Sequence, residues 1–339
     1  MAELPIAVTM GEPAGISAEI TARAWAARGQ YDLPPFFVIG DPDWAASGLA
    51  GLPVAEITAP RDCKAAFTQG LPVLPLNLHE PARPGTPSVA NAAVTLQSID
   101  RAVQLAQSGD VAAIVTNPIQ KSVLYDAGFR HPGHTEYLAH LTGAKSPPTM
   151  LLSCPDEGDR PGLRVALVTV HLPLSQVPAN LSETGIVATA RAVAQALPRD
   201  FGVTEPRLAI AALNPHSGEA GALGHEELSI IAPAIARLRA EGINAAGPLP
   251  ADTLFHAAAR RNHDCVICMY HDQALIPLKT IDFARGVNIT LGLDIVRTSP
   301  DHGVALDIAG QGRADPQSLI TALIAARDIA RNRVAYDAR

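Results

Sequence analysis

Short apolar segments rich in β-branched residues alternate with helical patterns along almost the whole chain, and this alternation restricts the fold more than any other feature. Buried parallel strands read as continuous apolar runs, whereas helices repeat apolar residues every three or four positions. Strands are predicted at Ile6–Met10, Phe36–Ile39, Val111–Thr116, Thr149–Ser153, Arg164–Val170, Leu208–Leu213, Cys265–Met269 and Val287–Thr290. Helices are predicted at Ser17–Arg28, Ala90–Gln107, Thr135–Leu141, Thr184–Ala196, Glu226–Ala240, Ala251–Arg261 and Pro316–Arg331. The alternation indicates an α/β fold with a mostly parallel sheet covered by helices.

The composition fits a compact enzyme. A chain of 339 residues is long enough for about two domains, and its 47% hydrophobic and 17% charged residues exclude a disordered chain. The net charge of −7, without a basic run, argues against a nucleic-acid partner. The sequence has neither the basic start of a signal peptide nor an apolar run near the roughly 20 residues of a membrane helix. We therefore expect a cytoplasmic protein that does not bind membranes.

Cys265 and Cys268 have the spacing of a redox or zinc pair, but they lie inside an apolar predicted strand. Residues three apart on a strand point to opposite faces, so the two thiols would not converge. We interpret both as core thiols. The absence of a disulfide pattern in a chain this large fits a reducing compartment.

Three histidines, His171, His216 and His271, each follow a predicted strand directly or within a few residues. In open α/β sheets, ligands bind beyond the carboxyl ends of the strands. Three imidazoles at that edge could hold one divalent cation and leave a coordination position for substrate, which is typical of a catalytic metal site. The alternative is three unrelated loop histidines, but three equivalent placements favour the metal site.

Two glycine-containing segments border predicted elements. Gly11–Ile16 joins the first strand to the first helix and is either a structural turn or a binding loop, because glycine allows the backbone to approach a ligand closely. It lacks the G-x-G-x-x-G pattern of dinucleotide-binding loops, which the sequence does not contain elsewhere. Gly218–Gly224 follows His216 and is predicted to be a flexible loop at the active edge.

Several polar residues could bind an anion. Thr135 could cap a helix while His134 faces outward, and helix N-termini attract anions. Further cationic and amide groups follow the third histidine strand, namely Lys279, Arg285, Asn288 and Arg297. They suit a phosphate or a carboxylate, or they form a solvated positive face. Asp252 and Asp272 lie in the same part of the sequence and could orient an ammonium group, bind the metal indirectly or act as a base.

Taken together, these segments resemble the 4-hydroxythreonine-4-phosphate dehydrogenase family of the pyridoxine pathway. The matching stretches are Gly11–Ile16, Gly133–Glu136, Val168–Pro173, Asn214–His216, Gly247–Thr253, Met269–Gln273, Gly286–Gly292 and Arg297–Gly303. They run in order along nearly the whole chain.

The resemblance implies a fold similar to the isocitrate and isopropylmalate dehydrogenases, with two α/β/α domains and an interdomain cleft. We expect residues 1–133 and 275–339 to form the first domain and residues 134–274 to form the second. It also implies a homodimer in which residues from both subunits complete each active site. Because that fold binds nicotinamide cofactors without the usual Rossmann loop, the resemblance explains the missing fingerprint.

The family pattern also implies roles for individual residues. His171, His216 and His271 match the ligands of a divalent metal, with zinc, cobalt or magnesium possible. The positions that match substrate ligands are His134, Thr135, Lys279, Asn288 and Arg297. Asp272, Asp252 and Lys279 are the candidate catalytic groups. The sequence does not identify the residues that bind the cofactor.

The reaction implied by the resemblance is the NAD-dependent, metal-dependent oxidation of 4-phosphooxy-L-threonine, with NADP as a possible cofactor. The product, 2-amino-3-oxo-4-phosphooxybutanoate, would lose carbon dioxide to give 3-amino-2-oxopropyl phosphate in pyridoxal phosphate biosynthesis. The alternative substrates are threonate or erythronate 4-phosphate, or an aromatic dihydrodiol. A phosphate-binding protein without catalysis is a third possibility, but binding alone does not require an open metal site.

Overall fold

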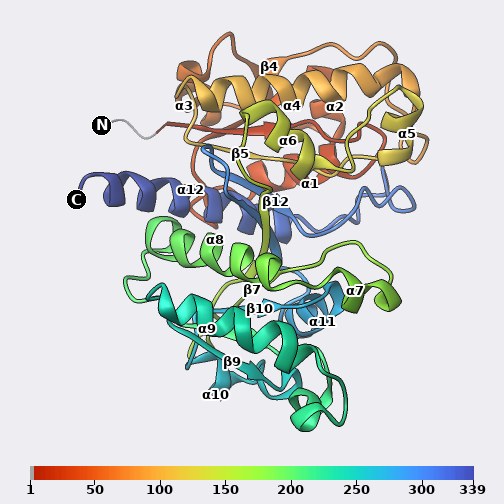
Figure 1. Ribbon diagram of the computed structural model, residues 1–339. Coiled ribbons are helices and arrows are strands. Elements are labelled where there is room, and N and C mark those ends of the chain that lie inside the picture. Colours follow the sequence, from red (N-terminus) through yellow and green to blue (C-terminus); the bar gives the residue numbers. More distant parts are fainter. Residues whose placement is uncertain (1–3) are drawn as a thin grey trace. The chain divides into compact units, whose positions relative to one another are not determined.

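The computed structural model describes residues 4–339, which form two compact units (Figure 1). Within the described residues, the first unit consists of residues 4–148 and Leu293–Arg331, and the second of Thr149–Gly292 and Asn332–Arg339. Both divisions lie further along the chain than the expected boundaries at 133/134 and 274/275. The reason is the antiparallel pairing of β6 (Thr149–Cys154) with β11 (Val287–Leu291), which assigns both strands to the second unit.

The first unit contains a parallel sheet in the order β3-β4-β2-β1-β5-β12. Its strands are β1 (Ile6–Thr9), β2 (Phe36–Gly40), β3 (Val54–Glu56), β4 (Leu71–Pro75), β5 (Ala113–Val115) and β12 (Arg297–Pro300). Its helices are α1 (Ser17–Ala26), α2 (Pro42–Ser47), α3 (Cys63–Phe67), α4 (Ala92–Gln107), α5 (Lys121–Asp126), α6 (His134–Thr142) and most of α12 (Gln317–Asp337). Figure 1 shows α4 and α1 on opposite sides of these strands.

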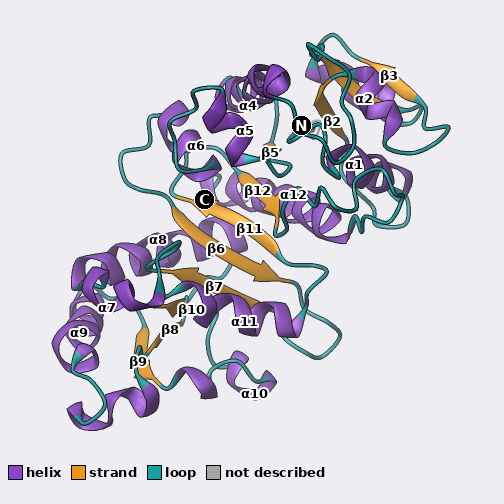
Figure 2. Ribbon diagram, turned by 90° about the vertical axis from the view of Figure 1, so that its right-hand side faces the viewer, coloured by secondary structure: helices purple, strands orange, loops and turns teal. Residues whose placement is uncertain are grey.

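The second unit contains a sheet in the order β11-β6-β7-β10-β8-β9. Its remaining strands are β7 (Leu163–Leu167), β8 (Leu208–Ala211), β9 (Ala245–Leu249) and β10 (Cys265–Cys268). Its helices are α7 (Val177–Asn180), α8 (Glu183–Phe201), α9 (Ala232–Ala240), α10 (Ala257–Arg260) and α11 (His271–Ile281). Strand β6 is antiparallel to both its neighbours, whereas the other pairs are parallel. Helices α8 and α11 both pack on the central strands of this sheet and cover its two opposite faces (Figure 2).

Alternation of side chains along the strands explains the two-sided burial. Ala274 and Leu278 of α11 pack with Leu167, Val266 and Cys268 in one hydrophobic cluster. The intervening strand residues point to the opposite face. Strands buried on both faces must be apolar at every position, which is why they are visible as continuous apolar runs in the sequence.

The α/β class and the mostly parallel sheet predicted from the sequence are confirmed, with β6 antiparallel to β7 and β11, and all the predicted strands are present. One predicted helix needs correction. The predicted helix Ala251–Arg261 is broken into a 3-10 turn, Ala251–Thr253, and the short helix α10. The chain is extended at His256 (φ −73°, ψ 156°), whose Nδ1 accepts a hydrogen bond from the Ala259 amide, so a new helix starts there.

The interpretation of Cys265 and Cys268 as core thiols is confirmed, since both are free and fully buried. Burial raises the pKa of the Cys265 thiol to about 12 and that of Cys268 well above its usual value. None of the helices within residues 4–339 has the length and apolar character needed to cross a membrane.

Candidate functional site

The three histidines predicted to bind metal follow neighbouring strands of the second unit. Strand β10 lies between β7 and β8, and all three strands are parallel. Their carboxyl ends therefore lie at one edge of the sheet, where ligands bind in folds of this class. His171 follows β7, His216 follows β8, and His271 is the first residue of α11 after β10.

His171 and His271 lie close together at this edge. Their ring centroids are 5.9 Å apart and the ring planes are inclined by 44°. Nδ1 of His271 lies 2.7 Å from Oδ1 of Asp272. A carboxylate at this distance holds a proton on Nδ1 and leaves the lone pair of Nε2 for a metal ion. Asp272 thus has the geometry of a residue that orients a metal ligand.

His216 lies on an uncommon stretch of backbone. The five consecutive residues from His216 to Ala220 all have positive φ values, between 43° and 75°. Gly218 is the one glycine among them. A non-glycine residue in the left-handed conformation costs roughly 1–2 kcal/mol and usually occurs singly. The predicted loop Gly218–Gly224 thus begins inside a left-handed turn, which we define as His216–Ala220.

The described part of this chain groups two of the three histidines. Within residues 4–339, no three histidine, cysteine, aspartate or glutamate side chains lie together in a group that could hold a metal ion. The structure brings His171 and His271 together and leaves His216, which is exposed on its turn, outside their group.

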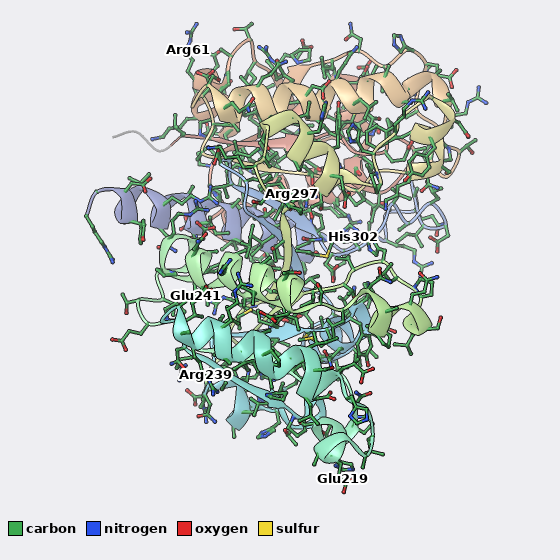
Figure 3. The ribbon with its side chains drawn as sticks, viewed as in Figure 1. Arg61, Glu219, Arg239, Glu241, Arg297 and His302 are labelled. Carbon is green, nitrogen blue, oxygen red and sulfur yellow. The ribbon has the colours of Figure 1, made fainter. Side chains whose placement is uncertain are left out.

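A second set of predicted site residues lies in the first unit, where Arg297 is almost fully buried on β12. Its exposed fraction is 3%, and its Nε and Nη2 atoms donate to Oγ1 of Thr116 at 3.1 and 2.7 Å. Figure 3 labels its side chain. Burial lowers the pKa of Arg297 to about 10, and the nearby carboxylate of Glu136 opposes that shift. A buried guanidinium gains from an anionic partner, so this position favours binding of a negatively charged ligand.

His134 lies close enough to Arg297 for the guanidinium charge to lower the pKa of its imidazole. Its Nε2 atom is buried and makes no hydrogen bond within the described part of the chain. Burial lowers the pKa of His134 well below its usual value, and the charges of Arg297 and Lys121 lower it further. The imidazole is therefore neutral at physiological pH, and it is available to bond a ligand through Nε2.

The predicted helix start at Thr135 is wrong. Helix α6 begins at His134, its N-cap is Gly133, and the cap makes no side-chain hydrogen bond. The expectation that His134 faces outward fails with it, because Nε2 of His134 is buried. Thr135 lies within the first turn of α6, where backbone N–H groups have no partner in the helix.

Lys121 is a basic residue of this region that the sequence interpretation missed. A Cβ atom placed on Gly133 would lie 3.4 Å from Nζ of Lys121, so the ammonium group lies against the start of α6. The side chain is otherwise exposed and accessible to a ligand. Its position just beyond the carboxyl end of β5 was the available signal.

The other predicted substrate and catalytic residues belong to the second unit. Lys279 lies on α11 with Nζ 5.2 Å from the ring centroid of Phe283, and it shares a helix face with Asp272. Asn288 lies on β11, and its Oδ1 atom is buried without a hydrogen-bond partner in the described residues. Asp252 lies in the 3-10 turn Ala251–Thr253.

The segment Gly11–Ile16 has a structural role. Gly11 has φ +71°, and a Cβ atom there would lie 2.7 Å from both Cβ of Asn117 and the carbonyl oxygen of Pro118. A Cβ on Gly15 would approach the carbonyl oxygen of Val304 equally closely. Both glycines are thus required where the turn packs against neighbouring backbone, which favours the structural-turn alternative.

Comparison with known proteins identifies the family. The protein-family model described as pyridoxal phosphate biosynthetic protein PdxA matches residues 32–326. A relative from Caulobacter vibrioides named 4-hydroxythreonine-4-phosphate dehydrogenase is 52% identical over 338 residues, which cover 98% of this chain and 99% of the relative. A relative of the same name from Maricaulis maris is 53% identical and covers 96% of this chain and 97% of its own.

A solved structure agrees with these matches. The crystal structure of 4-hydroxythreonine-4-phosphate dehydrogenase from Klebsiella pneumoniae is 37% identical, covers 97% of this chain and 98% of its own, and superposes with a TM-score of 0.85. The chain therefore belongs to the PdxA family of pyridoxal phosphate biosynthetic proteins and, like these relatives, is a dehydrogenase.

Proposed function

We propose that the protein oxidises 4-phosphooxy-L-threonine to 2-amino-3-oxo-4-phosphooxybutanoate with NAD as the oxidant and a divalent metal in the site. The product then loses carbon dioxide to give 3-amino-2-oxopropyl phosphate. The observation that carries the proposal is the pairing of His171 with His271 at the carboxyl edge of three parallel strands. Asp272 supports it, since its carboxylate is hydrogen-bonded to the ring of His271. The name shared by the relatives supports this choice of substrate.

The metal ligands in this proposal are His171, His216 and His271. Neutral imidazoles suit zinc or cobalt better than magnesium, which prefers oxygen. Bound there, the cation would supply positive charge to stabilise an oxyanion that develops on the substrate. Asp272 orients the ring of His271. Because one chain groups two of the imidazoles, we infer a homodimer in which the partner subunit completes the ligand set.

The anionic groups of the substrate are bound by the basic residues described above. Arg297 supplies a buried guanidinium whose planar N–H groups fit a phosphate or carboxylate. His134 and Thr135 contribute the imidazole and the free N–H groups at the start of α6. Lys279 and Asn288 complete the set of proposed substrate ligands.

The oxidation removes a proton from the substrate hydroxyl and a hydride from its carbon. NAD, or NADP in its place, accepts the hydride. Since Asp272 is engaged with His271, we assign it the orienting role and assign the proton to Asp252 or Lys279. A carboxylate at Asp252 could also pair with the ammonium group of the substrate, which threonate and erythronate phosphates lack.

A substrate panel tests the proposal. The purified protein is incubated with Co²⁺ and NAD, and NADH absorbance is followed with 4-phosphooxy-L-threonine, threonate 4-phosphate, erythronate 4-phosphate and an aromatic dihydrodiol. We expect NADH and carbon dioxide with the first substrate, and no turnover by a His216→Ala variant that keeps its circular dichroism spectrum. Turnover of another compound alone would overturn the substrate assignment.

The dihydrodiol is in the panel because of a second structural relative. The crystal structure of a terephthalate 1,2-cis-dihydrodiol dehydrogenase from Burkholderia xenovorans LB400 is 25% identical, covers 96% of this chain and 98% of its own, and has a TM-score of 0.63. The guanidinium of Arg297 would accept the carboxylate of such a diol as well as a phosphate, so the panel decides between the two substrates.

A further inference from the structure

A buried carboxylate, Glu227, binds the segment of chain that leads into His216. Its exposed fraction is 2%, and it lies in the π-helical turn Glu227–Ile231. Its Oε1 atom accepts hydrogen bonds from the backbone N–H groups of Leu213 and Asn214 at 2.8 and 2.7 Å. Its Oε2 atom accepts from Nδ2 of Asn214 at 3.0 Å. One carboxylate thus fixes the two residues that come shortly before the histidine.

The left-handed turn folds closely over the same carboxylate. A Cβ atom on Gly218 would lie 2.6 Å from Oε2 of Glu227, so only glycine fits at this point of the turn. The amide of Leu223 donates to the carbonyl oxygen of Gly218 at 3.1 Å and closes the turn on its far side. A Cβ atom on Gly224 would lie 2.4 Å from Nδ2 of Asn214, which itself bonds Glu227. The turn therefore encloses the carboxylate from both ends.

Left-handed backbone in four non-glycine residues is not stable by itself, so contacts from outside the turn must hold it. A buried carboxylate is likewise retained only where hydrogen bonds replace its hydration. Glu227 meets both requirements, because its bonds to Leu213 and Asn214 set the direction in which the chain enters the turn.

We propose that Glu227 is a positioning residue that holds the left-handed turn and so presents the imidazole of His216 to the divalent cation. This inference rests on the proposed function, in which His216 is a metal ligand. Glu227 does not touch the metal or the substrate. It acts through the backbone of the turn, as the partners of metal ligands do when they fix the orientation of a ligand.

Cobalt binding to the metal-free, full-length protein tests this role without measuring turnover. Co²⁺ is titrated into the wild type, Glu227→Gln, His216→Ala and Glu219→Gln, and the visible absorption bands report both affinity and ligand geometry. Glutamine cannot accept at both ends, so its amide nitrogen would face either the backbone N–H groups or Nδ2 of Asn214. We expect Glu227→Gln to weaken Co²⁺ binding by about 10–100-fold and to alter the bands.

Glu219→Gln is the matched control, since Glu219 lies in the same turn but its side chain is exposed and points outward (Figure 3). We expect it to bind Co²⁺ as the wild type does. If Glu227→Gln fails to fold by circular dichroism, Glu227→Asp takes its place, because it keeps the buried charge and draws the carboxylate back from the N–H groups of Leu213 and Asn214.

The outcomes separate this inference from the function on which it rests. Wild-type affinity and bands in the folded Glu227→Gln or Glu227→Asp variant, with weakened binding in His216→Ala, would overturn the role of Glu227 and leave the proposed ligand set intact. Wild-type binding in His216→Ala would overturn the ligand set itself, and this inference with it.

Discussion

Replacing Arg297 by methionine should stabilise the free protein while weakening substrate binding. Methionine is uncharged and takes the place of the aliphatic part of the arginine side chain, so the change removes the buried guanidinium and keeps the packing of that aliphatic part. The two effects have opposite signs because the charge is costly without an anion and useful with one.

The magnitude of the stabilisation follows from the lowered pKa. The pKa of Arg297 falls from 12.5 to about 10, and at 1.36 kcal/mol per pKa unit this corresponds to about 3 kcal/mol against the charged form. Above the unfolded-state pKa the arginine is neutral in both states and does not destabilise the fold. As the pH falls through the folded pKa the buried charge forms and this stability is lost, so at neutral pH the charge destabilises the fold by the full amount. Losing the bonds to Thr116 offsets about 1 kcal/mol each, so we expect a net gain of at most about 1 kcal/mol.

Substrate binding should change in the other direction. Loss of a charge-assisted hydrogen bond costs about 1.5–3 kcal/mol, which raises KM by roughly 10–150-fold. Arg297→Lys should not restore KM, since a point charge does not reproduce two parallel N–H groups. Denaturant unfolding of the free protein and steady-state kinetics measure the two effects. A less stable Arg297→Met variant with a wild-type KM would refute the reasoning.

Three further predictions concern titratable side chains outside the metal site. Lys121→Ala should raise KM for the phosphorylated substrate by about 3–10-fold, whereas the same change at Lys64 on α3 should leave KM unaltered. The pKa of His134 is lowered well below 6.5, so its contribution to stability is present above pH 6.5 and is lost as the pH falls. The free energy of unfolding should therefore drop between about pH 7 and about pH 5. His134→Gln should flatten this decline, and an unchanged slope in the variant would contradict the role given to His134. Burial would raise the pKa of Asp200, but hydrogen bonds from Arg333 and Arg199 outweigh it and lower that pKa. Arg333→Ala leaves Asp200 bonded to Arg199 and should therefore cost about 1.5–3 kcal/mol in denaturant unfolding; an unchanged stability would contradict the assignment.

The strands that the sequence did not reveal lack the apolar continuity of the others. Strand β4 is Leu71-Pro-Val-Leu-Pro75, and proline argues against a strand because it cannot donate to the ladder. Strand β9 contains Gly247 and Pro248 and lies at the edge of its sheet, where such residues are tolerated. Strand β12 is largely polar and is stabilised at long range, since Oγ1 of Thr298 donates to the carbonyl oxygen of Ala322 on α12.

The candidate site was predictable where it depends on strand ends and unpredictable where it depends on distant contacts. Three apolar strands followed by histidines sufficed to place His171 and His271 at one sheet edge. Nothing local distinguishes Glu227 from a solvent-facing glutamate, because its partners lie in another segment of the chain. For the same reason the left-handed turn could not be anticipated, since the sequence there contains a single glycine among five residues.

The burial of every cysteine makes the native protein inert to thiol reagents. Cys63, Cys154, Cys265 and Cys268 are free and buried, and burial raises the pKa of each thiol, which suppresses the reactive thiolate. A single cysteine introduced at an exposed position would then be the one fast-reacting group, so probes can be attached without first removing the native thiols. Slow labelling of the native cysteines would report how often each unit opens its core, because a reagent reaches them only when the packing around the strands is transiently lost.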